Sequence, residues 1–300
     1  MINDITRGLS AFPLTPFHDD QVDEGASIGL VERLAASGVD SITALGSTGS
    51  YAYLNADERA RVAWLAVRHA GETPVIIGVG DLRTSHVLTH VTSAEQAGAA
   101  GLLLAPMTYQ ALTADDVFEL YRTVTEHTSL PVIVYDNPGT THFTFTIDLY
   151  ARIAQLPGIA SIKIPGVPTD PSKAAEHVAT IRAAVPEHVT IGVSGDAFGA
   201  TGLNAGCDAW YSVIAGTLPA PALAISRAAQ AGRDAAVTAE SERLAPLWAL
   251  FAEFGSLRVT AAIAEHLGLA QPRSLPLPIQ GLTHEQRDRV ARVVDELGLA

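Results

Sequence analysis

The sequence predicts an α/β protein, a (β/α)8 or TIM barrel with a helical appendage at its C-terminus. Short apolar runs alternate with longer amphipathic segments as far as about residue 230, which implies parallel strands joined by crossover helices. Eight of the runs are strand candidates, the number that closes a barrel. An open doubly wound sheet alternates in the same way, but no G-x-G-x-x-G motif follows the first strand, and this favours the barrel.

Eight apolar runs are the predicted strands. Each is short and bounded by glycine, proline or polar residues, which is typical of buried parallel strands. They are Leu9–Leu14, Ser41–Leu45, Val75–Val79, Gly101–Ala105, Val132–Tyr135, Ile159–Ile164, Val189–Val193 and Ala209–Val213.

Amphipathic segments between these runs are the predicted helices. Asn55 and Thr113 each precede a segment with two acidic residues in its first turn, as an N-cap before a helix does. Three segments run into a glycine, the common C-terminal stop. The predicted helices are Asp23–Ser37, Ala56–Ala70, Thr84–Gly98, Thr113–Thr128, Thr146–Leu156 and Asp170–Val185.

Strand signals stop after about residue 230, which divides the chain into a catalytic barrel (1–230) and a helical segment packed on it (231–300). Helices are predicted over Asp234–Phe254, Leu257–Leu267 and Thr283–Leu297. Three prolines mark an extended connection before the last helix, because proline disfavours helix at the residue before it.

Composition excludes several classes of protein. The 300-residue chain has 19 basic and 32 acidic residues, a net charge of −13, which argues against a nucleic-acid or acidic-membrane partner. No apolar stretch reaches the roughly 18 residues of a membrane span, and Met1–Arg7 lacks the pattern of a signal peptide. Cys207 is the one cysteine, which fits a reducing compartment. We therefore expect a cytoplasmic protein.

A lysine near the end of the sixth predicted strand is the strongest chemical signal. Side chains alternate along a strand, so Ile159, Ser161 and Lys163 share one face, which we expect to point into the barrel. Burial there lowers the pKa of the Lys163 amine, and the neutral amine can form a Schiff base with a carbonyl. The alternative is a lysine paired with an internal carboxylate, but no acidic partner is evident on a neighbouring strand.

Three further motifs follow predicted strands, and each has a purely structural alternative. Tyr135 ends the fifth strand, and its phenol is either a proton relay or an ordinary buried hydroxyl. The Gly46–Ser50 segment either presents backbone N–H groups to a carboxylate or forms a plain turn. Asp196 follows the seventh strand and is better explained as a helix cap than as a catalytic carboxylate.

No metal site or cofactor is predicted. His86 and His90 are four residues apart on a predicted helix, a spacing that can chelate a metal. Val87 stands where an H-E-x-x-H motif has glutamate, and the helix belongs to the outer ring. We therefore expect two solvated histidines there, and a solvated loop histidine at His142.

Together the motifs resemble those of the dihydrodipicolinate synthase / N-acetylneuraminate lyase family of class I pyruvate-dependent lyases. The resemblance extends from Leu9–Phe17 through the helical tail. Its specific part is the combination of G-[ST]-T-G, Y-x-N-P and a strand-end lysine at these separations.

The resemblance implies a homotetrameric barrel enzyme and assigns roles within it. Lys163 matches the lysine that captures pyruvate or another 2-oxo acid, and Tyr135 matches the proton-relay tyrosine. Thr48 matches the hydroxyl residue that assists this relay. Ser47 and Thr48 cover the positions whose backbone amides hold the substrate carboxylate, and Gly195 matches a backbone position that lines the pocket.

Departures from the family pattern bear on the second substrate. The synthase branch has an arginine where this chain has Thr140, and loss of a guanidinium is not conservative. The sialic-acid branch has acidic residues after the seventh-strand glycine, of which only Asp196 remains. Tyr211 replaces a smaller apolar residue and is expected to narrow the pocket or change its polarity. Tyr109 lies close to the position of the synthase tyrosine offered to a neighbouring subunit, without clear register.

We therefore expect a Schiff-base-forming aldolase or hydro-lyase that acts on pyruvate or another 2-oxo acid, with an aldehyde as a candidate second substrate. Because of Thr140, we expect it not to be a true dihydrodipicolinate synthase. Two alternatives stay open: a dihydrodipicolinate synthase or N-acetylneuraminate lyase proper, and a non-catalytic 2-oxo acid binding protein. The set of Lys163, Tyr135 and Thr48 favours the enzyme, because carboxylate binding alone needs no such set.

Overall fold

A closed barrel of eight parallel strands forms the centre of the computed structural model, which describes residues 5–299. Each strand pairs with the next along the chain, and the last pairs with the first. The predicted (β/α)8 barrel is therefore confirmed. The N-terminal segment that was inspected for a signal peptide lies partly outside the described residues, at Met1–Asp4. The barrel strands are β1 Gly8–Ala11, β4 Ser41–Ala44, β5 Val75–Gly78, β6 Gly101–Leu104, β7 Val132–Tyr135, β8 Ile159–Ile164, β9 Thr190–Ser194 and β10 Ala209–Ser212.

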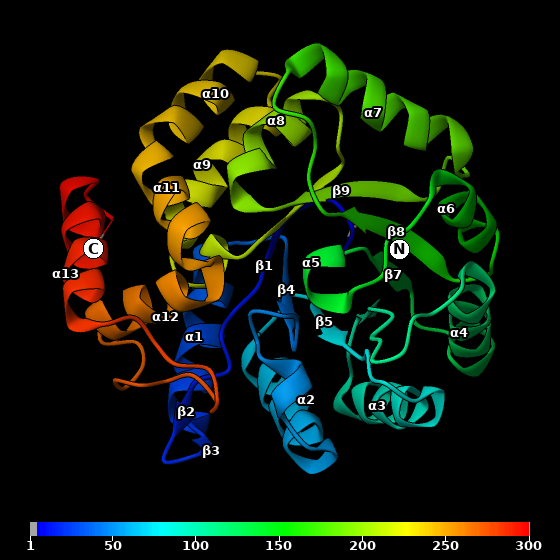
Figure 1. The fold of residues 1–300 in the computed structure, drawn as a ribbon, viewed down its shortest axis with the longest axis horizontal. Helices are drawn as coiled ribbons and strands as arrows, with labels where there is room; N and C mark the ends of the chain where they lie inside the picture. The colour runs from blue at the N-terminus through cyan, green and yellow to red at the C-terminus, as the bar shows by residue number, and fades with distance from the viewer. Residues whose placement is uncertain (1–4, 300) are drawn as a thin grey trace.

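Helices surround the barrel as an outer ring (Figure 1). The side chains of Asn55 and Thr113 cap the helices that follow them, each as part of a capping box, as their sequence context predicts. The sequence pattern did not predict α8 and α9, the last two helices of the ring. The ring helices are α1 Glu24–Ser37, α2 Ala56–His69, α3 Thr84–Ala97, α4 Ala114–His127, α6 Ile147–Ala154, α7 Pro171–Ala184, α8 Gly199–Asn204 and α9 Pro219–Gln230.

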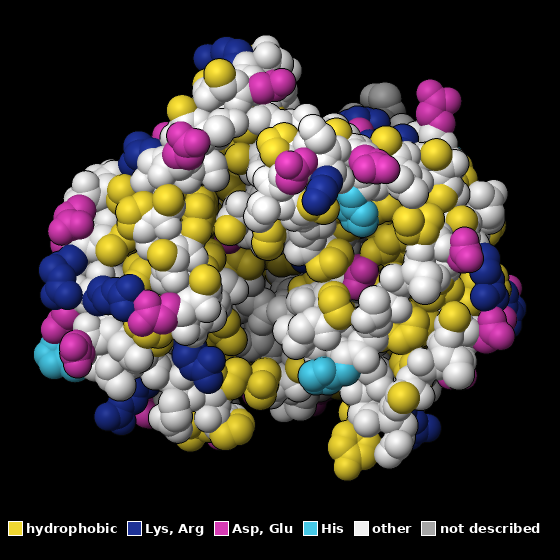
Figure 2. Space-filling view, turned by 45° about the horizontal axis from the view of Figure 1, so that its top comes forward, with side chains coloured by type: hydrophobic (Ala, Val, Ile, Leu, Met, Phe, Trp, Pro, Cys, Tyr) yellow, Lys and Arg dark blue, Asp and Glu magenta, His cyan; other side chains and the backbone are white. Residues whose placement is uncertain are grey.

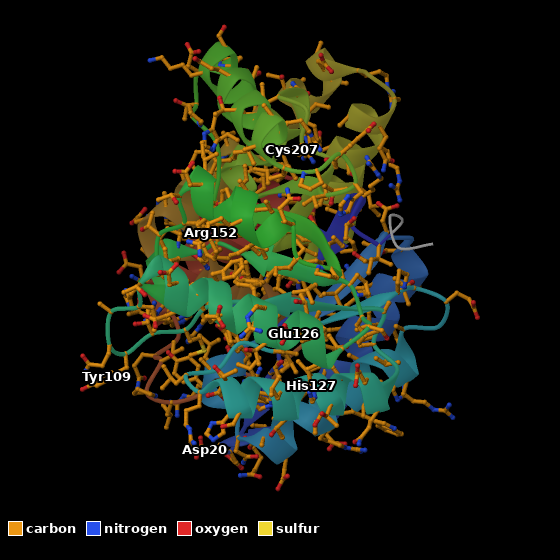
Figure 3. All side chains as sticks on the ribbon, turned by 90° about the vertical axis from the view of Figure 1, so that its right-hand side faces the viewer. Asp20, Tyr109, Glu126, His127, Arg152 and Cys207 are labelled. Atoms are coloured by element: carbon orange, nitrogen blue, oxygen red, sulfur yellow. The ribbon has the colours of Figure 1, made fainter. Side chains whose placement is uncertain are left out.

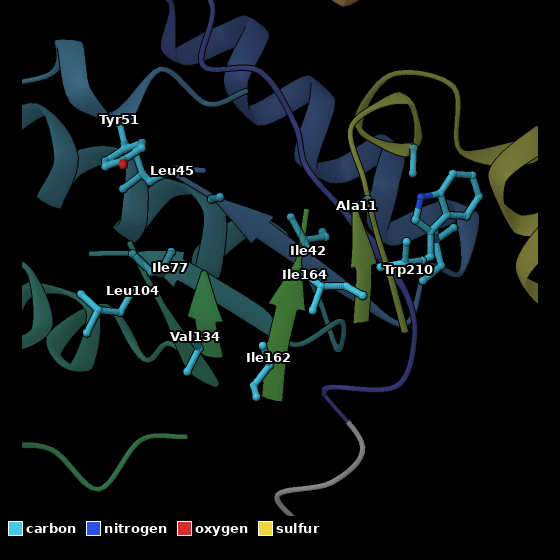
Figure 4. Packing of buried hydrophobic residues seen from close by; sticks show 14 of the residues in the cluster. Ala11, Ile42, Leu45, Tyr51, Ile77, Leu104, Val134, Ile162, Ile164 and Trp210 are labelled. Atoms are coloured by element: carbon cyan, nitrogen blue, oxygen red, sulfur yellow. The ribbon is translucent and has the colours of Figure 1, made fainter. Parts of the chain in front are cut away.

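Two apolar layers stabilise this arrangement. The larger lies between the strands and the helices, where side chains such as Ile42, Ile162 and Trp210 are buried (Figure 4). A smaller cluster, which includes Phe12 and Tyr211, fills the inside of the barrel. The barrel is therefore a packed core that is open to ligand at one end.

A register shift in β8 changes which of its side chains point inward. Val132 of β7 pairs with Ile159, but the next residue, Ile133, pairs with Ser161, so Ala160 is the extra residue of a β-bulge. Ile159 consequently packs in the outer layer, and the prediction that it shares the inner face of Ser161 and Lys163 is wrong.

The C-terminal helices lie along one side of the barrel (Figure 1). The single helix predicted over Asp234–Phe254 is wrong, because the chain forms two helices that meet at Leu244. Pro246, in the first turn of the second helix, has no N–H to continue the first one. The C-terminal helices are α10 Asp234–Arg243, α11 Ala245–Phe254, α12 Ser256–His266 and α13 His284–Glu296.

Three smaller elements complete the fold. Strands β2 (Phe17–His18) and β3 (Gln21–Val22) form a hairpin, and α5 (Pro138–Thr141) is a single turn after β7. Among the described residues, no single helix has the length and apolarity to cross a membrane. Helices α11 and α12 together have the required length and apolarity, but the chain bends by 119° between them.

Gly78 at the end of β5 is required by close approach of the backbone. A Cβ at this position would lie 1.9 Å from the carbonyl oxygen of Leu45. We expect Gly78→Ala to lower the free energy of unfolding by about 1–3 kcal/mol or more, the usual cost of overpacking. Gly29, on the exposed side of α1 with open space around it, is the matched control, because Gly29→Ala should stabilise the helix slightly. Urea unfolding of both variants measures the difference, and equal stabilities would contradict the packing argument.

Candidate active site

A pocket of about 420 Å³ opens at the carboxyl end of the barrel, where the surface is hollowed near its centre in Figure 2. Its lining includes all the predicted site residues: Lys163, Tyr135, Ser47, Thr48, Gly195, Thr140 and Tyr211. A second hollow of about 500 Å³ lies between the β2–β3 hairpin and the connection to α13. It contains none of these residues, so the barrel pocket is the candidate active site.

Lys163 lies deep in this pocket, with only 4% of its surface exposed. Its backbone pairs with Tyr135 on one side and with Gly192 on the other. The ammonium nitrogen lies 4.0 Å from the centre of the Tyr135 ring and 5.3 Å from that of Phe12. Burial lowers the pKa of Lys163, and the nearby Tyr135 opposes this shift. A neutral amine is therefore more available here than on an exposed lysine.

The Tyr135 hydroxyl lies at the centre of a small polar network. The side-chain amide of Asn137 donates a hydrogen bond to it over 2.8 Å, and the Ser47 hydroxyl lies 3.1 Å away. The resemblance assigned the relay partner to Thr48, but Thr48 is buried in the pocket lining, and the contact with Tyr135 is made by Ser47. The hydroxyl beside Tyr135 in this structure is therefore that of Ser47. Both hydroxyl residues follow β4, as the sequence motif predicts.

Tyr211 shapes the floor of the pocket. Its ring occupies space that a side chain at residue 192 would fill, since a Cβ on Gly192 would lie 2.2 Å from the Tyr211 ring. Its hydroxyl donates to the Ser161 hydroxyl over 2.9 Å inside the barrel. Tyr211 thus reduces the volume of the pocket. Its hydroxyl already has a hydrogen-bond partner in Ser161, inside the barrel.

Two buried carboxyl groups lie near Lys163, although no acidic neighbour was evident from the strands. Asp196 accepts hydrogen bonds from the hydroxyl of Ser212 and from two backbone N–H groups that follow β10. The prediction that it caps its own following helix is wrong, because it anchors the neighbouring strand's loop instead. Asp136 accepts from the Tyr150 hydroxyl. Burial raises the pKa of both carboxyls to about 6.

A buried arginine supports the pocket wall behind Tyr51, and no sequence signal pointed to it. Arg59 is 3% exposed and donates to the carbonyls of Gly78 and Gly80. Its guanidinium lies 5.3 Å from the ring centre of Tyr51, which lines the pocket. Arg59 therefore positions one wall from outside the cavity.

The two histidines of α3 differ from the expectation. His86 is exposed, but His90 is buried and lies 3.0 Å from a carboxylate oxygen of Asp81. The prediction of a solvated His90 is therefore wrong, whereas His142 is exposed as predicted. Within residues 5–299, no group of three or more His, Cys, Asp or Glu side chains is placed to hold a metal ion.

The C-terminal part of the chain supplies one side of the pocket mouth. Ser256 and Leu257, from the start of α12, and Ile279, from the connection to α13, all line it. These residues are far from the barrel strands in sequence, and no motif marks them. Only the packing of the C-terminal helices against the barrel brings them to the site.

A closed barrel with a buried lysine beside a hydrogen-bonded tyrosine at its carboxyl end defines a class of enzyme. Class I lyases use a lysine amine to form an imine with a carbonyl substrate, and this chain is such a lyase. The match to the Dihydrodipicolinate synthetase family model extends over residues 5–297. The chain therefore belongs to the dihydrodipicolinate synthase family.

Relatives match along the whole chain. The 4-hydroxy-tetrahydrodipicolinate synthase of Phenylobacterium zucineum is 30% identical over 302 residues and covers 100% of both chains. A dihydrodipicolinate synthase from Agrobacterium tumefaciens is 41% identical, with a TM-score of 0.95 over 99% of this chain and 100% of that one. The Acinetobacter baumannii enzyme, crystallised with pyruvate, is 24% identical and shares the fold, with a TM-score of 0.88 over 98% of this chain and 100% of that one.

Asp136 gives the stability of the protein a predictable pH dependence. Because its pKa is raised to about 6 in the folded chain, the folded state holds the proton more tightly than the unfolded state. The stability that this provides is present at low pH and is lost as the pH rises through about 6. We expect Asp136→Asn, which keeps an acceptor for Tyr150, to gain melting temperature relative to the unmodified protein between about pH 4 and about pH 8.

Glu187→Gln is the control for this measurement, because Glu187 is exposed and its substitution should leave the pH dependence unchanged. Thermal unfolding of the three proteins at several pH values measures the effect. A constant gap between Asp136→Asn and the unmodified protein would show that Asp136 titrates normally.

Proposed function

We propose that this chain forms a Schiff base between Lys163 and pyruvate, or a closely related 2-oxo acid, and makes or breaks a bond at the adjacent carbon. The observation that supports this most directly is the pairing of a buried Lys163 with Tyr135 on neighbouring strands. A protein that only binds a carboxylate does not require a buried lysine beside a tyrosine. Pyruvate is favoured because a solved member of the family, the Acinetobacter baumannii enzyme, was crystallised with it.

The residues of the pocket fit the steps of such a reaction. The neutral amine of Lys163 attacks the substrate carbonyl, and loss of water leaves an iminium that accepts electrons from the adjacent carbon. Tyr135, held by Ser47 and Asn137, is placed to carry protons between the amine, the leaving oxygen and the reacting carbon. Backbone N–H groups at Ser47 and Thr48 are the proposed cradle for the substrate carboxylate.

Thr140 leads us to propose that the enzyme is not a dihydrodipicolinate synthase in the strict sense. It lies in α5 at the pocket wall, and its hydroxyl is 3.4 Å from the carbonyl oxygen of Asn137. A threonine there offers no guanidinium for a carboxylate on the second substrate. The relatives reported above carry the name of the synthase, and an assay with aspartate semialdehyde separates the proposal from the alternative of a true synthase.

Exposed apolar side chains support the proposal that the chain forms a homotetramer. Tyr109 is 88% exposed and projects from the edge of the molecule in Figure 3. Leu82 and Tyr53 are also large, apolar and exposed, as is common at surfaces that bind another protein.

A cytoplasmic location stays part of the proposal. Burial raises the pKa of the Cys207 thiol to about 12, so its reactive thiolate form is rarer than that of an exposed cysteine.

Removal of the Lys163 amine tests the imine directly. We expect Lys163→Ala to abolish turnover while the barrel still folds, because no other lysine lines the pocket among the described residues. Lys163→Arg is the matched control, since it keeps a positive charge but has no neutral amine at working pH. Borohydride reduction in the presence of pyruvate, followed by peptide mass spectrometry, should locate the adduct on Lys163. An adduct elsewhere, or activity in Lys163→Ala, would refute the imine mechanism.

Loss of the Tyr135 hydroxyl tests the proton relay. Tyr135→Phe should lower kcat by roughly 10²–10⁴, the range typical of general acid–base catalysis, with circular dichroism showing an intact fold. A kcat within about twofold of the unmodified enzyme, far below that range, would remove Tyr135 from the mechanism.

Two further variants distinguish the hydroxyl residues after β4. Because Ser47 rather than Thr48 lies beside Tyr135, Ser47→Ala should reduce kcat more than Thr48→Val does. The reverse order would restore the role that the family resemblance gave to Thr48.

A further inference from the structure

The walls of the pocket indicate the chemistry of the second substrate. We propose that the compound that reacts with the Lys163-bound enamine is a short, uncharged aldehyde. This inference rests on the proposed imine chemistry, and it adds the class of molecule that occupies the outer part of the pocket.

Charge is the first argument. Among the described residues that line the pocket, Lys163 is the only one with a charged side chain. Formation of an imine with pyruvate uses this amine, and the pyruvate carboxylate then takes the backbone N–H groups near Ser47. A second carboxylate would enter the pocket without a cationic partner, and desolvation of an unpaired charge is costly.

The surroundings make a second anion still less favourable. Asp136 and Asp196 are buried close enough to Lys163 to influence its pKa. Neither carboxyl lines the pocket, so neither is placed to bind the ammonium group of an amino-acid aldehyde. The pocket therefore disfavours a second anion and provides no direct partner for a second cation.

Hydrogen-bonding groups and apolar groups share the outer wall. Asn137 and Thr140 border the pocket from the turn after β7, and Ser256 borders it from the start of α12. Leu257 and Ile279 add apolar surface beside Ser256. Hydroxyl and amide groups can donate to and accept from a substrate hydroxyl without any net charge.

Size limits the length of the aldehyde. The pocket volume of about 420 Å³ is near the lower end for small-molecule sites, and Tyr211 closes it from below. Room for pyruvate and a short aldehyde is consistent with this volume, whereas a long sugar chain is not.

The proposed reaction balances without any other reagent. During imine formation Tyr135 gives its proton to the leaving hydroxyl, which departs as water. The resulting phenolate takes a proton from the methyl group of the pyruvate imine, and the enamine carbon forms a bond to the aldehyde carbon. The aldehyde oxygen takes that proton from Tyr135 and becomes a hydroxyl. Water then hydrolyses the imine and returns a proton to Tyr135, and this step releases a 4-hydroxy-2-oxo acid and the free amine of Lys163.

Pairs of aldehydes that differ in charge test the proposal. Glycolaldehyde is compared with glyoxylate, and 4-hydroxybutanal with succinate semialdehyde, each with pyruvate and the full-length enzyme. Product is followed by mass spectrometry. We expect kcat/KM to be about 10–100-fold higher for the uncharged member of at least one pair, the range that an unpaired buried group commonly costs.

Two variants identify the wall that makes this distinction. Thr140→Arg should reduce the preference for 4-hydroxybutanal over succinate semialdehyde by at least about tenfold, because it supplies a fork of donors for the carboxylate. Arg258→Gln is the control. Arg258 is an exposed neighbour of Leu257 that donates to the backbone carbonyl of Gln280, and its loss should leave the preference unchanged.

The outcomes separate this inference from the proposed function. If borohydride traps no pyruvate on Lys163, the imine chemistry itself fails. If the adduct forms but the acidic aldehydes react as well as or better than their uncharged partners, the inference is overturned while the imine chemistry stands. The inference is also overturned if the adduct forms and no uncharged aldehyde reacts, or if Arg258→Gln changes the preference for 4-hydroxybutanal over succinate semialdehyde as much as Thr140→Arg does.

Discussion

The burial of one amine is the constraint on which the site depends. Burial in the closed barrel lowers the pKa of Lys163, which makes its neutral amine more available than that of an exposed lysine. Lys163 pairs with Tyr135 on one neighbouring strand and with Gly192, which has no side chain, on the other. The same hydrogen-bonded ring of strands that stabilises the fold therefore buries the lysine and holds Tyr135 beside it.

Parts of the chain outside the strands form the outer wall of the pocket. The turn after β7 presents Thr140, and the C-terminal helices present Ser256 and Leu257 at the mouth. These positions form the outer wall, whereas Lys163 and Tyr135 form the inner one. Under the proposed function, imine formation and the choice of second substrate would therefore depend on separate elements of this chain.

Local patterns were sufficient to predict much of the fold. The eight strands and the capped helices follow from short-range signals, because capping and apolar periodicity involve neighbours along the chain. Errors arose where distant contacts decide the outcome. The bulge at Ala160 turns Ile159 outward, and His90 is buried by its contact with Asp81. The break of the predicted helix at Leu244 was readable from Pro246 in the sequence.

The sequence by itself determined the alternation of strands and helices, the lysine at a strand end, the tyrosine beside it and the hydroxyl-rich turn, because each depends on residue type and spacing along one short segment. The tertiary structure alone decided that Ser47 rather than Thr48 contacts Tyr135, that Asp196 anchors a neighbouring loop, and that α12 reaches the pocket. The first two sets of contacts join residues from 16 to 88 positions apart in sequence, and only barrel closure and helix packing bring such residues together.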